Sequence, residues 1–321
     1  KTSKMMRMIQ KMKNDFLTMI EQADTIAITG HVRPDGDCVG STVGLYNYII
    51  SNYDKQVQIY LEEFSKDFLF LHDADKISHT PTDQVYDLCI AVDCGDKERQ
   101  GDFLPIFEHA KSTMCVDHHI SNPGFGEVCY VDAEACSAAE ALYKLMEQDK
   151  INKNAAEALY MGIVHDTGVF KHSNTTKSAM SIAGDLIEKG ANPSFIIDET
   201  FYKKTFVANK LLGIALTKAE QHADGRIIST VLEAEDFRKS GAGKIDTDGI
   251  VDQLRITEGT ETAVFIYQTG EDEYKISLRS NNIVDVSRIS CNHGGGGHVR
   301  AAGFSMKGDI KEILAGVIEE I

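Results

Sequence analysis

The chain has 321 residues, 42% hydrophobic and 26% charged, a composition typical of globular proteins that bury sizeable cores. Its 33 Lys and Arg against 49 Asp and Glu give a formal charge of −16, which argues against binding of long duplex nucleic acid. No run of 18 or more apolar residues occurs, so we expect no membrane-spanning helix.

The N-terminal segment and the cysteines indicate a cytoplasmic protein. Met5, Met8, Met12, Phe16 and Met19 recur at helical spacing and predict an amphipathic helix. The segment has neither the long apolar core nor the cleavage site of a signal peptide. The seven cysteines are scattered without a CxxC pair, as is typical of reduced, buried thiols.

The first half of the chain alternates strand and helix patterns. Short apolar runs rich in β-branched residues predict strands of a buried parallel sheet at residues 25–30, 56–61, 87–92, 112–116 and 126–131. Three apolar helix faces lie between and after them: Val39, Val43, Tyr46 and Ile50; Ala139, Leu142, Tyr143 and Met146; Ala155, Leu159, Gly162 and Ile163. This alternation predicts an α/β layered domain.

The second half begins with helices and then returns to strands. Residues 175–189 predict a helix closed by Gly190, and residues 203–221 a connecting helix. A second, smaller α/β pattern follows, with strands at 226–232, 262–269 and 273–280 and a final helix. We therefore expect a first domain over 1–190, a helical linker over 191–222 and a second domain over 223–321.

Acids and histidines gather where the predicted elements end. They lie in four short motifs: His31, Asp35 and Asp37 in "HVRPDGD", Asp93 in "VDCGD", Asp117, His118 and His119 in "VDHH", and His165 and Asp166 in "HDTG". In open α/β sheets such ends meet at one edge, where four carboxylates would repel one another unless cations are bound. Mixed carboxylates and imidazoles suit Mn²⁺, and also Zn²⁺, Fe²⁺ or Co²⁺.

The number of ligands favours a pair of ions. Six ligands from four loops are more than one open ion needs, whereas two ions about 3.5–4 Å apart can share a carboxylate. Taken singly, each motif has a simpler interpretation. Asp93 alone could be an N-cap, "PDGD" alone a turn, and His165 a packing residue. Their joint occurrence favours the metal site.

The motifs resemble a known family. "HVRPDGDCVGS", "VDCGD", "VDHH" and "HDTG" resemble, in order and spacing, the motifs of the DHH phosphoesterase superfamily, and "GGGGHVRAAG" resembles the phosphate-contacting motif of the DHHA1 domain. The compact length is similar to the bacterial nanoRNase/pAp phosphatase branch. The resemblance implies an N-terminal DHH domain with a mainly parallel sheet flanked by helices, a connecting helix, and a smaller α/β DHHA1 domain.

The resemblance also implies a division of labour at the site. One Mn²⁺ would be held by His31, Asp35 and Asp93, and the other by Asp37, Asp93, His118 and Asp166. Asp93 would bridge the two ions, and His119 would face the scissile phosphate. Asp117 would orient the histidine pair, so that Asp93, Asp117, His118 and His119 form the catalytic group.

The C-terminal motif is expected to bind substrate. Consecutive glycines, Gly294–Gly297, are not expected inside a packed element, but they let backbone N–H groups approach an anion. A flexible surface loop is the alternative. The family context favours the following substrate contacts besides His119: Arg279, Gly296, Gly297 and His298. Arg300 and Arg99 are weaker candidates, and His293 is expected to be a loop residue.

These expectations define one leading function and its alternatives. The leading function is hydrolysis of short oligoribonucleotides to mononucleotides, and removal of the 3′-phosphate of 3′-phosphoadenosine 5′-phosphate (pAp), by water that two metal ions activate. The alternatives are a cyclic-dinucleotide or pApA phosphodiesterase, an exopolyphosphatase or pyrophosphatase, and a catalytically silent nucleotide-binding module. The expected partners are short oligoribonucleotides and small phosphorylated nucleotides, not long duplexes or membranes, with a homodimer left open.

Overall fold

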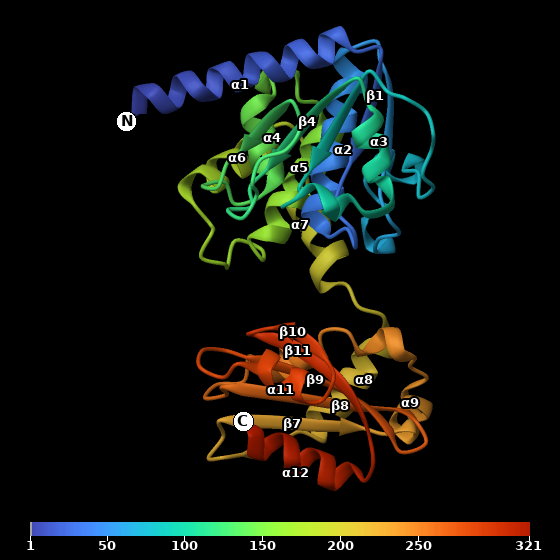
Figure 1. Ribbon diagram of the computed structural model, residues 1–321. Helices are drawn as coiled ribbons and strands as arrows, with labels where there is room; N and C mark the ends of the chain where they lie inside the picture. Colours follow the sequence, from blue (N-terminus) through green and yellow to red (C-terminus); the bar gives the residue numbers. More distant parts are fainter. Residues whose placement is uncertain (1) are drawn as a thin grey trace. The chain divides into compact units, whose positions relative to one another are not determined.

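The chain forms two compact units. A computed structural model describes residues 2–321, with side chains from residue 9 onward. The units are Lys1–Lys203, blue to yellow in Figure 1, and Lys204–Ile321, yellow to red. Each unit is one sheet with helices packed on both faces, which confirms the predicted α/β class. Within the described residues no helix is long and apolar enough to cross a membrane.

Unit 1 is built on a five-stranded parallel sheet. Its order is β2-β1-β3-β4-β5, and every neighbouring pair is parallel. The strands confirm the five predicted ones: β1 (Thr25–Thr29), β2 (Gln56–Tyr60), β3 (Leu88–Val92), β4 (Ser112–Asp117) and β5 (Val128–Val131). The order reverses direction between β1 and β3. In open α/β sheets, ligands bind outside the carboxyl ends of the strands at such a reversal.

Alternating side chains of β1, β2 and β3 supply two cores in unit 1. Ile26 and Ile28 of β1 enter one core, whereas Ala27 enters the other, as the two-residue period of a strand requires. The larger core is covered by helices α1 (Thr2–Gln22), α2 (Gly36–Asn52), α4 (Ala138–Leu145), α5 (Lys153–Asp166) and α6 (Lys177–Glu188). The smaller core is covered by α3 (Leu104–His109) and the preceding turn η3 (Lys97–Phe103).

Two helix predictions are refined by the structure. In α1, Phe16 is fully buried and Met12 and Met19 pack against the core, whereas the side chains of Met5 and Met8 lie outside the described residues. The face predicted for α2 is only half right. Tyr46 is partly exposed and Ile50 is 38% exposed, because α2 lies inside the unit and buries nearly all its other positions. A helix that is buried on most sides has no single apolar stripe from which its buried face could be predicted.

Unit 2 is built on a six-stranded mixed sheet. Its order is β10-β11-β9-β8-β7-β6, in which only the pair β7–β8 is parallel among the described strands. The strands are β6 (Glu220–His222), β7 (Ile227–Leu232), β8 (Thr262–Gly270), β9 (Glu273–Ser280), β10 (Gly296–His298) and β11 (Ala301–Lys307). Contrary to expectation, Gly296 and Gly297 form an edge strand, since glycines can pair at an edge where no side-chain layer is needed.

Helices cover both faces of the second sheet. One face packs on α11 (Val286–Asn292) and α12 (Ile310–Glu320), and the other on α8 (Phe206–Thr217) and α10 (Ile250–Arg255), with α9 (Ala234–Ser240) beside them. Leu211 and Ala215 of α8 are fully buried in that second core. The helix predicted as a connector therefore contributes to the core of unit 2.

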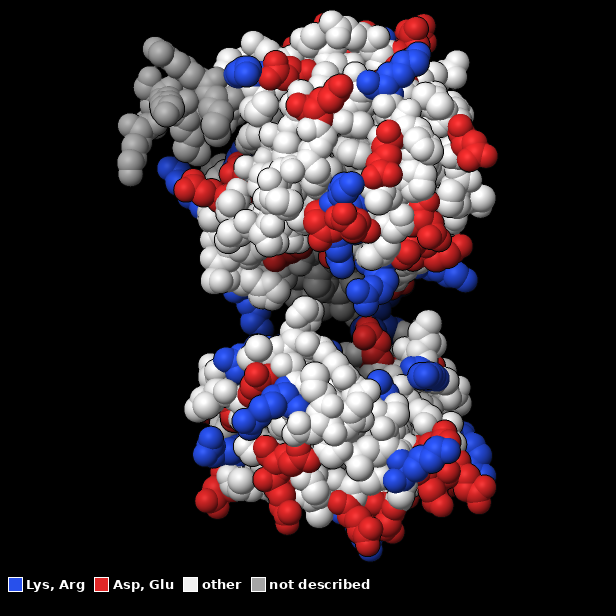
Figure 2. Space-filling model, viewed as in Figure 1, with Lys and Arg blue, Asp and Glu red and all other residues white. Residues whose placement is uncertain are grey.

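The segment before α8 belongs to unit 1. It contains α7 (Pro193–Ile197) and the π-helical turn η5 (Asp198–Tyr202). Short 3₁₀ turns complete the list of elements: η1 (Lys66–Phe68), η2 (Ala74–Lys76), η4 (Gln148–Lys150) and η6 (Lys244–Thr247). On the face shown in Figure 2, Lys and Arg are interspersed with Asp and Glu over both units.

Candidate metal centre

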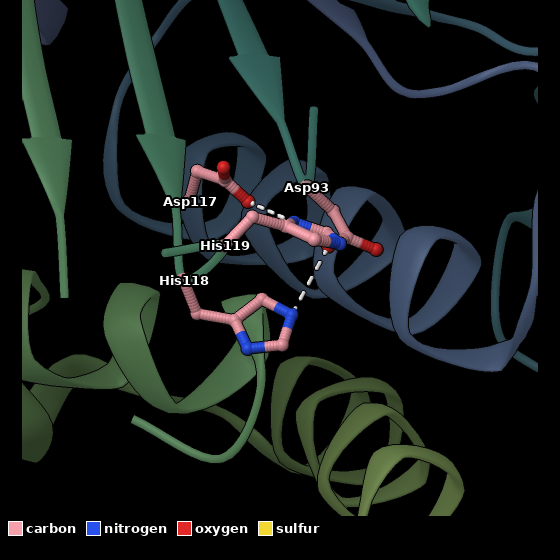
Figure 3. Close-up of side chains that lie close together, drawn as sticks. All are labelled: Asp93, Asp117, His118 and His119. Atoms are coloured by element: carbon pink, nitrogen blue, oxygen red, sulfur yellow. Dashed lines mark hydrogen bonds and ion pairs between the residues drawn. The ribbon is translucent and has the colours of Figure 1, made fainter. Parts of the chain in front are cut away.

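The predicted metal ligands of unit 1 converge at the carboxyl edge of its sheet. His31 follows β1, Asp93 follows β3, and His118 follows β4, while Asp166 is the last residue of α5. Their donor atoms form three overlapping groups, in each of which the atoms lie within 4.8 Å of one another: Asp93, Asp117, His118 and His119; His31, Cys38 and Asp93; Asp37, His118 and Asp166. Figure 3 shows the first group, with both histidines directed toward Asp93.

Asp93 lies at the junction of the groups. Its Oδ2 is 3.4 Å from His31 Nε2, and its Oδ1 is 3.5 Å from His118 Nε2. The residue is 3% exposed, and Oδ1 has no hydrogen-bond partner among the described residues. Its φ of 60° is left-handed, a costly conformation for a residue other than glycine. A buried carboxylate with one oxygen facing each histidine fits a position between two cations.

The first turn of α2 supplies two further acids. Asp35 is its N-cap, and Oδ1 accepts hydrogen bonds from the backbone N–H groups of Asp37 and Cys38. Asp35 Oδ1 is also 3.7 Å from His31 Nε2, although this carboxylate is 60% exposed. The structure thus places Asp35 at the rim of the site and Asp37 in its interior.

Asp37 makes contacts that the sequence did not indicate. It is fully buried, and its two oxygens accept hydrogen bonds from the N–H groups of Ala138 (2.6 Å) and Ala139 (3.1 Å). These groups belong to the first turn of α4, whose N-terminus favours a negative charge. Asp37 Oδ2 lies 3.9 Å from His118 Nε2. The helix end therefore compensates part of the cost of burying this charge.

The acids on the His118 side strongly perturb one another. Burial, followed by the charges of Asp93 and Asp166, raises the pKa of Asp37 well above its usual range. Burial and the charge of Asp93 raise the pKa of Asp166 to about 7. His118 Nε2 is 3.2 Å from Asp166 Oδ2. Burial alone would lower the pKa of His118, but Asp93 and the neighbouring acids raise it to about 10. A bound cation would replace these protons as the compensating charge.

His119 is oriented by a hydrogen-bonded chain. Its Nδ1 lies 2.7 Å from Asp117 Oδ1, and Asp117 is fully buried. Asn122 Nδ2 donates to Asp117 Oδ2 at 2.7 Å and to the carbonyl of Cys94 at 2.9 Å. The hydrogen bond that His119 donates to Asp117 raises the pKa of His119. Sequence reasoning missed Asn122; its position five residues after Asp117, in a turn-forming "SNPG", was the available signal.

His31 presents one nitrogen to the site. Its Nδ1 is 2.9 Å from the carbonyl of Val32, which fixes the proton on Nδ1 and leaves the Nε2 lone pair free. Arg99, a weaker predicted contact, is nearby, with Nη2 3.5 Å from His31 Nδ1. The structure therefore places Arg99 beside the metal groups, where an anionic ligand would be attracted.

His165 lies outside the three groups. Its ring contacts Gly36 and packs between Phe68 and Phe201, with ring centroids 5.1 and 4.5 Å away. Burial lowers its pKa to about 4, so the ring is neutral. These contacts agree with the packing interpretation of His165.

The predicted substrate contacts of unit 2 lie at one edge of its sheet. His298 pairs with Ala301 and Ala301 with Arg279, so the three side chains share one face across β10, β11 and β9. Gly297 has a φ of 145°, and a Cβ there would lie 2.5 Å from the Ala301 carbonyl. Arg279 Nε is 3.4 Å from Asp252 Oδ1. Arg279 and His298 therefore lie on one face of the sheet with the small Ala301 between them.

Two other candidates in unit 2 have structural partners. Arg300 donates to the Ser280 hydroxyl and to the carbonyls of Val284 and Asn282. His293 Nε2 lies 2.6 Å from Glu320 Oε1, and its ring stacks on Phe304. These contacts explain both residues without a substrate.

Comparison with known proteins agrees with this geometry. The DHH family, N-terminal domain, matches residues 25–163, and the DHHA1 domain matches residues 224–321. The chain is similar to "Bifunctional oligoribonuclease and PAP phosphatase NrnA" of Bacillus subtilis, with 28% identity covering 92% of this chain and 93% of that protein. It is also similar to "Cyclic-di-AMP phosphodiesterase PdeA" of Listeria monocytogenes, with 26% identity covering 90% of this chain and 46% of that protein.

A solved structure shares the fold of the whole chain. An exopolyphosphatase-related protein from Bacteroides fragilis superposes with a TM-score of 0.81 at 24% identity, covering 97% of this chain and 95% of that chain. The two matched domains, the strand order and the converging acids and histidines lead to one conclusion. The chain belongs to the DHH family of phosphoesterases and carries a DHHA1 domain as its second unit.

Proposed function

We propose that the chain hydrolyses short oligoribonucleotides to mononucleotides and removes the 3′-phosphate of pAp, with two divalent ions, Mn²⁺ being the expected one. The observation that carries this proposal is Asp93. A buried, left-handed carboxylate faces His31 with one oxygen and His118 with the other, and Oδ1 lacks a hydrogen-bond partner among the described residues.

The donor set supports two ion positions. His31, Asp35 and Asp93 would hold one ion, and Asp37, Asp93, His118 and Asp166 the other. Divalent ions bound by these side chains would lower the pKa of a water and offset charge on phosphoryl oxygens. The excess of buried acids fits this demand, because each acid raises the pKa of its neighbours when no cation is near.

The protein's own groups would position the phosphate. Asp117 holds the proton of His119 on Nδ1, so that Nε2 is available to the substrate. When the ring is protonated, Nε2–H can donate a hydrogen bond to a phosphoryl oxygen as its charge grows. His119 is 42% exposed and so remains accessible to a ligand.

Unit 2 carries its own candidate contacts to a phosphorylated nucleotide. Arg279, Gly296, Gly297 and His298 lie in adjacent strands, and His298 is exposed. A guanidinium, backbone N–H groups and an imidazole are suitable donors to phosphate oxygens.

The names of the relatives support the substrate class. The Bacillus protein is named for oligoribonuclease and PAP phosphatase activity and matches over nearly its whole length. The Listeria protein is named as a cyclic-di-AMP phosphodiesterase, and this chain spans less than half of it. Hydrolysis of a cyclic or linear dinucleotide such as pApA is therefore the second candidate.

A substrate panel tests the proposal. Purified protein with Mn²⁺ is offered pAp, pApA, a five-nucleotide RNA, a cyclic dinucleotide, pyrophosphate and polyphosphate, each with and without a chelator. Chelator-sensitive turnover of pAp and the RNA is expected. Preferential turnover of dinucleotides or of inorganic phosphates would favour those alternatives. Nucleotide binding without turnover under any divalent metal would contradict the enzyme assignment.

A further inference from the structure

Cys38 lies within the proposed metal centre, although the motif that contains it, "HVRPDGDCVGS", predicted no role for the cysteine. It occupies the first turn of α2 and is fully buried. Its Sγ, a ring nitrogen of His31 and a carboxylate oxygen of Asp93 all lie within 4.8 Å of one another. This is one of the three donor groups of the site, and it is the group that contains a sulfur atom.

A second observation points to a ligand at the same place. The His31 side chain is only 6% exposed, and its Nε2 faces Asp93 Oδ2 at 3.4 Å and Asp35 Oδ1 at 3.7 Å. Both distances exceed the usual range of an N–H···O hydrogen bond. A buried imidazole nitrogen that faces two carboxylates without bonding closely to either is arranged as expected around an ion.

The backbone holds the Cys38 thiol beside His31. The N–H of Cys38 donates to Asp35 Oδ1 at 3.1 Å, which fixes the start of the helix. A Cβ at Gly30 would lie 2.3 Å from Cys38 Sγ, so the sulfur packs directly on the strand end that precedes His31. Other buried thiols have different neighbours: Cys89 Sγ lies 3.9 Å from Thr29 Oγ1, and Cys94 Sγ lies 3.5 Å from the Val92 carbonyl.

We propose that Cys38 is a ligand of the ion at His31 and Asp93, with Asp35 as the fourth donor. The inference rests on the metal centre of the proposed function and deepens it. One nitrogen, one sulfur and two carboxylate oxygens are a donor set suited to tetrahedral Zn²⁺, and also to Co²⁺ or Fe²⁺, whereas Mn²⁺ prefers oxygen-rich sites. The thiol would therefore let this position bind those ions more tightly than Mn²⁺, while the acid-rich position at Asp37, His118 and Asp166 keeps the expectation of Mn²⁺. On binding, the thiol proton leaves to the solvent and the sulfur lone pair is donated to the ion.

Cobalt spectroscopy tests the assignment directly. Metal-free protein is titrated with Co²⁺, and the near-ultraviolet charge-transfer band of a thiolate–Co²⁺ bond is recorded without any substrate. The band is expected in the wild type and in Cys89→Ser, a control at an equally buried thiol outside the three groups. It should be lost in Cys38→Ser and Cys38→Ala. Absence of the band from the Co²⁺-loaded wild type, or its persistence in Cys38→Ala, would overturn the assignment.

Metal affinities give a second readout. Cys38→Ser should weaken Zn²⁺ binding by at least the roughly 10- to 100-fold that loss of an outer partner of a metal ligand causes. Mn²⁺ binding should change much less, because Mn²⁺ gains little from sulfur. Equal changes for the two ions would contradict the proposal.

X-ray absorption spectroscopy of the Zn²⁺-loaded wild type is a third test, and it does not depend on whether a variant folds. It should show sulfur at about 2.3 Å in the wild type. A shell of nitrogen and oxygen alone would overturn the role of Cys38 while leaving the phosphoesterase proposal intact. Failure of the wild type to bind any divalent ion would instead refute both.

Discussion

Asn122 offers the sharpest test of how His119 is positioned. Its side-chain amide donates to Asp117 Oδ2 at 2.7 Å and to the Cys94 carbonyl at 2.9 Å. The other oxygen of Asp117, Oδ1, accepts a hydrogen bond from His119 Nδ1. Asn122→Ala removes both hydrogen bonds of the amide without removing any predicted metal ligand. We expect the Asp117 carboxylate to rotate and His119 to lose its fixed orientation.

The expected fall in kcat follows from the negative charge of the Asp117 carboxylate, which accepts the lost hydrogen bond. A hydrogen bond to a charged group contributes about 1.5–3 kcal/mol. If all of it is lost in the transition state, at about 1.36 kcal/mol for each factor of ten, kcat falls by roughly 10- to 150-fold. KM should change much less, because Asn122 bonds Asp117 and a backbone carbonyl and acts on the substrate only through His119.

Steady-state hydrolysis of pAp with Mn²⁺ measures kcat and KM separately, and thermal unfolding reports any loss of stability. The matched control is Asn47→Ala. The Asn47 amide also donates twice, to the carbonyls of Val43 and His72, but it lies in the middle of α2. The control should lose stability while keeping kcat. A kcat for Asn122→Ala within about twofold of the wild type would refute the positioning argument, since a lost bond of even 0.5 kcal/mol would exceed that ratio.

Four further changes test other parts of the structure. Asp93→Ala should abolish every hydrolytic activity and weaken Mn²⁺ binding at both positions, as calorimetry can measure; near-normal rates would contradict the bridging assignment. His298→Ala should raise KM for nucleotides and leave Mn²⁺ affinity unchanged, and an altered metal affinity would count against a contact to substrate alone. Leu142→Ala removes a fully buried side chain and should cost about 2–5 kcal/mol in chemical denaturation; a cost below 1 kcal/mol would show that the core refills. The hydrogen bond from Lys111 holds the pKa of Asp87 below its usual range, so its stabilisation is complete above about pH 4 and is lost as the pH falls further. The difference in Tm between the wild type and Asp87→Asn should therefore shrink below that pH, and a constant difference would contradict the charge argument.

The sequence was sufficient to predict the sheet of unit 1 and where its acids gather. Residues 25–30 and 87–92 are short apolar runs that contain β-branched residues, which is the pattern of strands buried on both faces. The structure has strands β1 and β3 at these positions. Since parallel strands end at one edge, His31 and Asp93 could be placed together before any distance was known. Their separation and the orientation of each oxygen could not be predicted.

The remaining features depend on contacts between distant segments. Asp37 bonds backbone groups 101 and 102 residues further along the chain, and a pattern of residue types contains no trace of such a pair. Cys38 resembled any other buried thiol until the loop of His31 was folded against it. The strand at Gly296 was missed because local propensity disfavours glycine in strands, whereas pairing with β11 decides its conformation.

The way in which α4 holds Asp37 separates folding from metal uptake. Both oxygens of this fully buried acid accept hydrogen bonds from the start of that helix, so protein contacts hold its side chain in place once the chain has folded. A zinc finger, by contrast, stays unfolded until its ion arrives. We therefore expect the metal-free protein to fold, so that the supply of ions would change how much of it is active rather than how much of it is present.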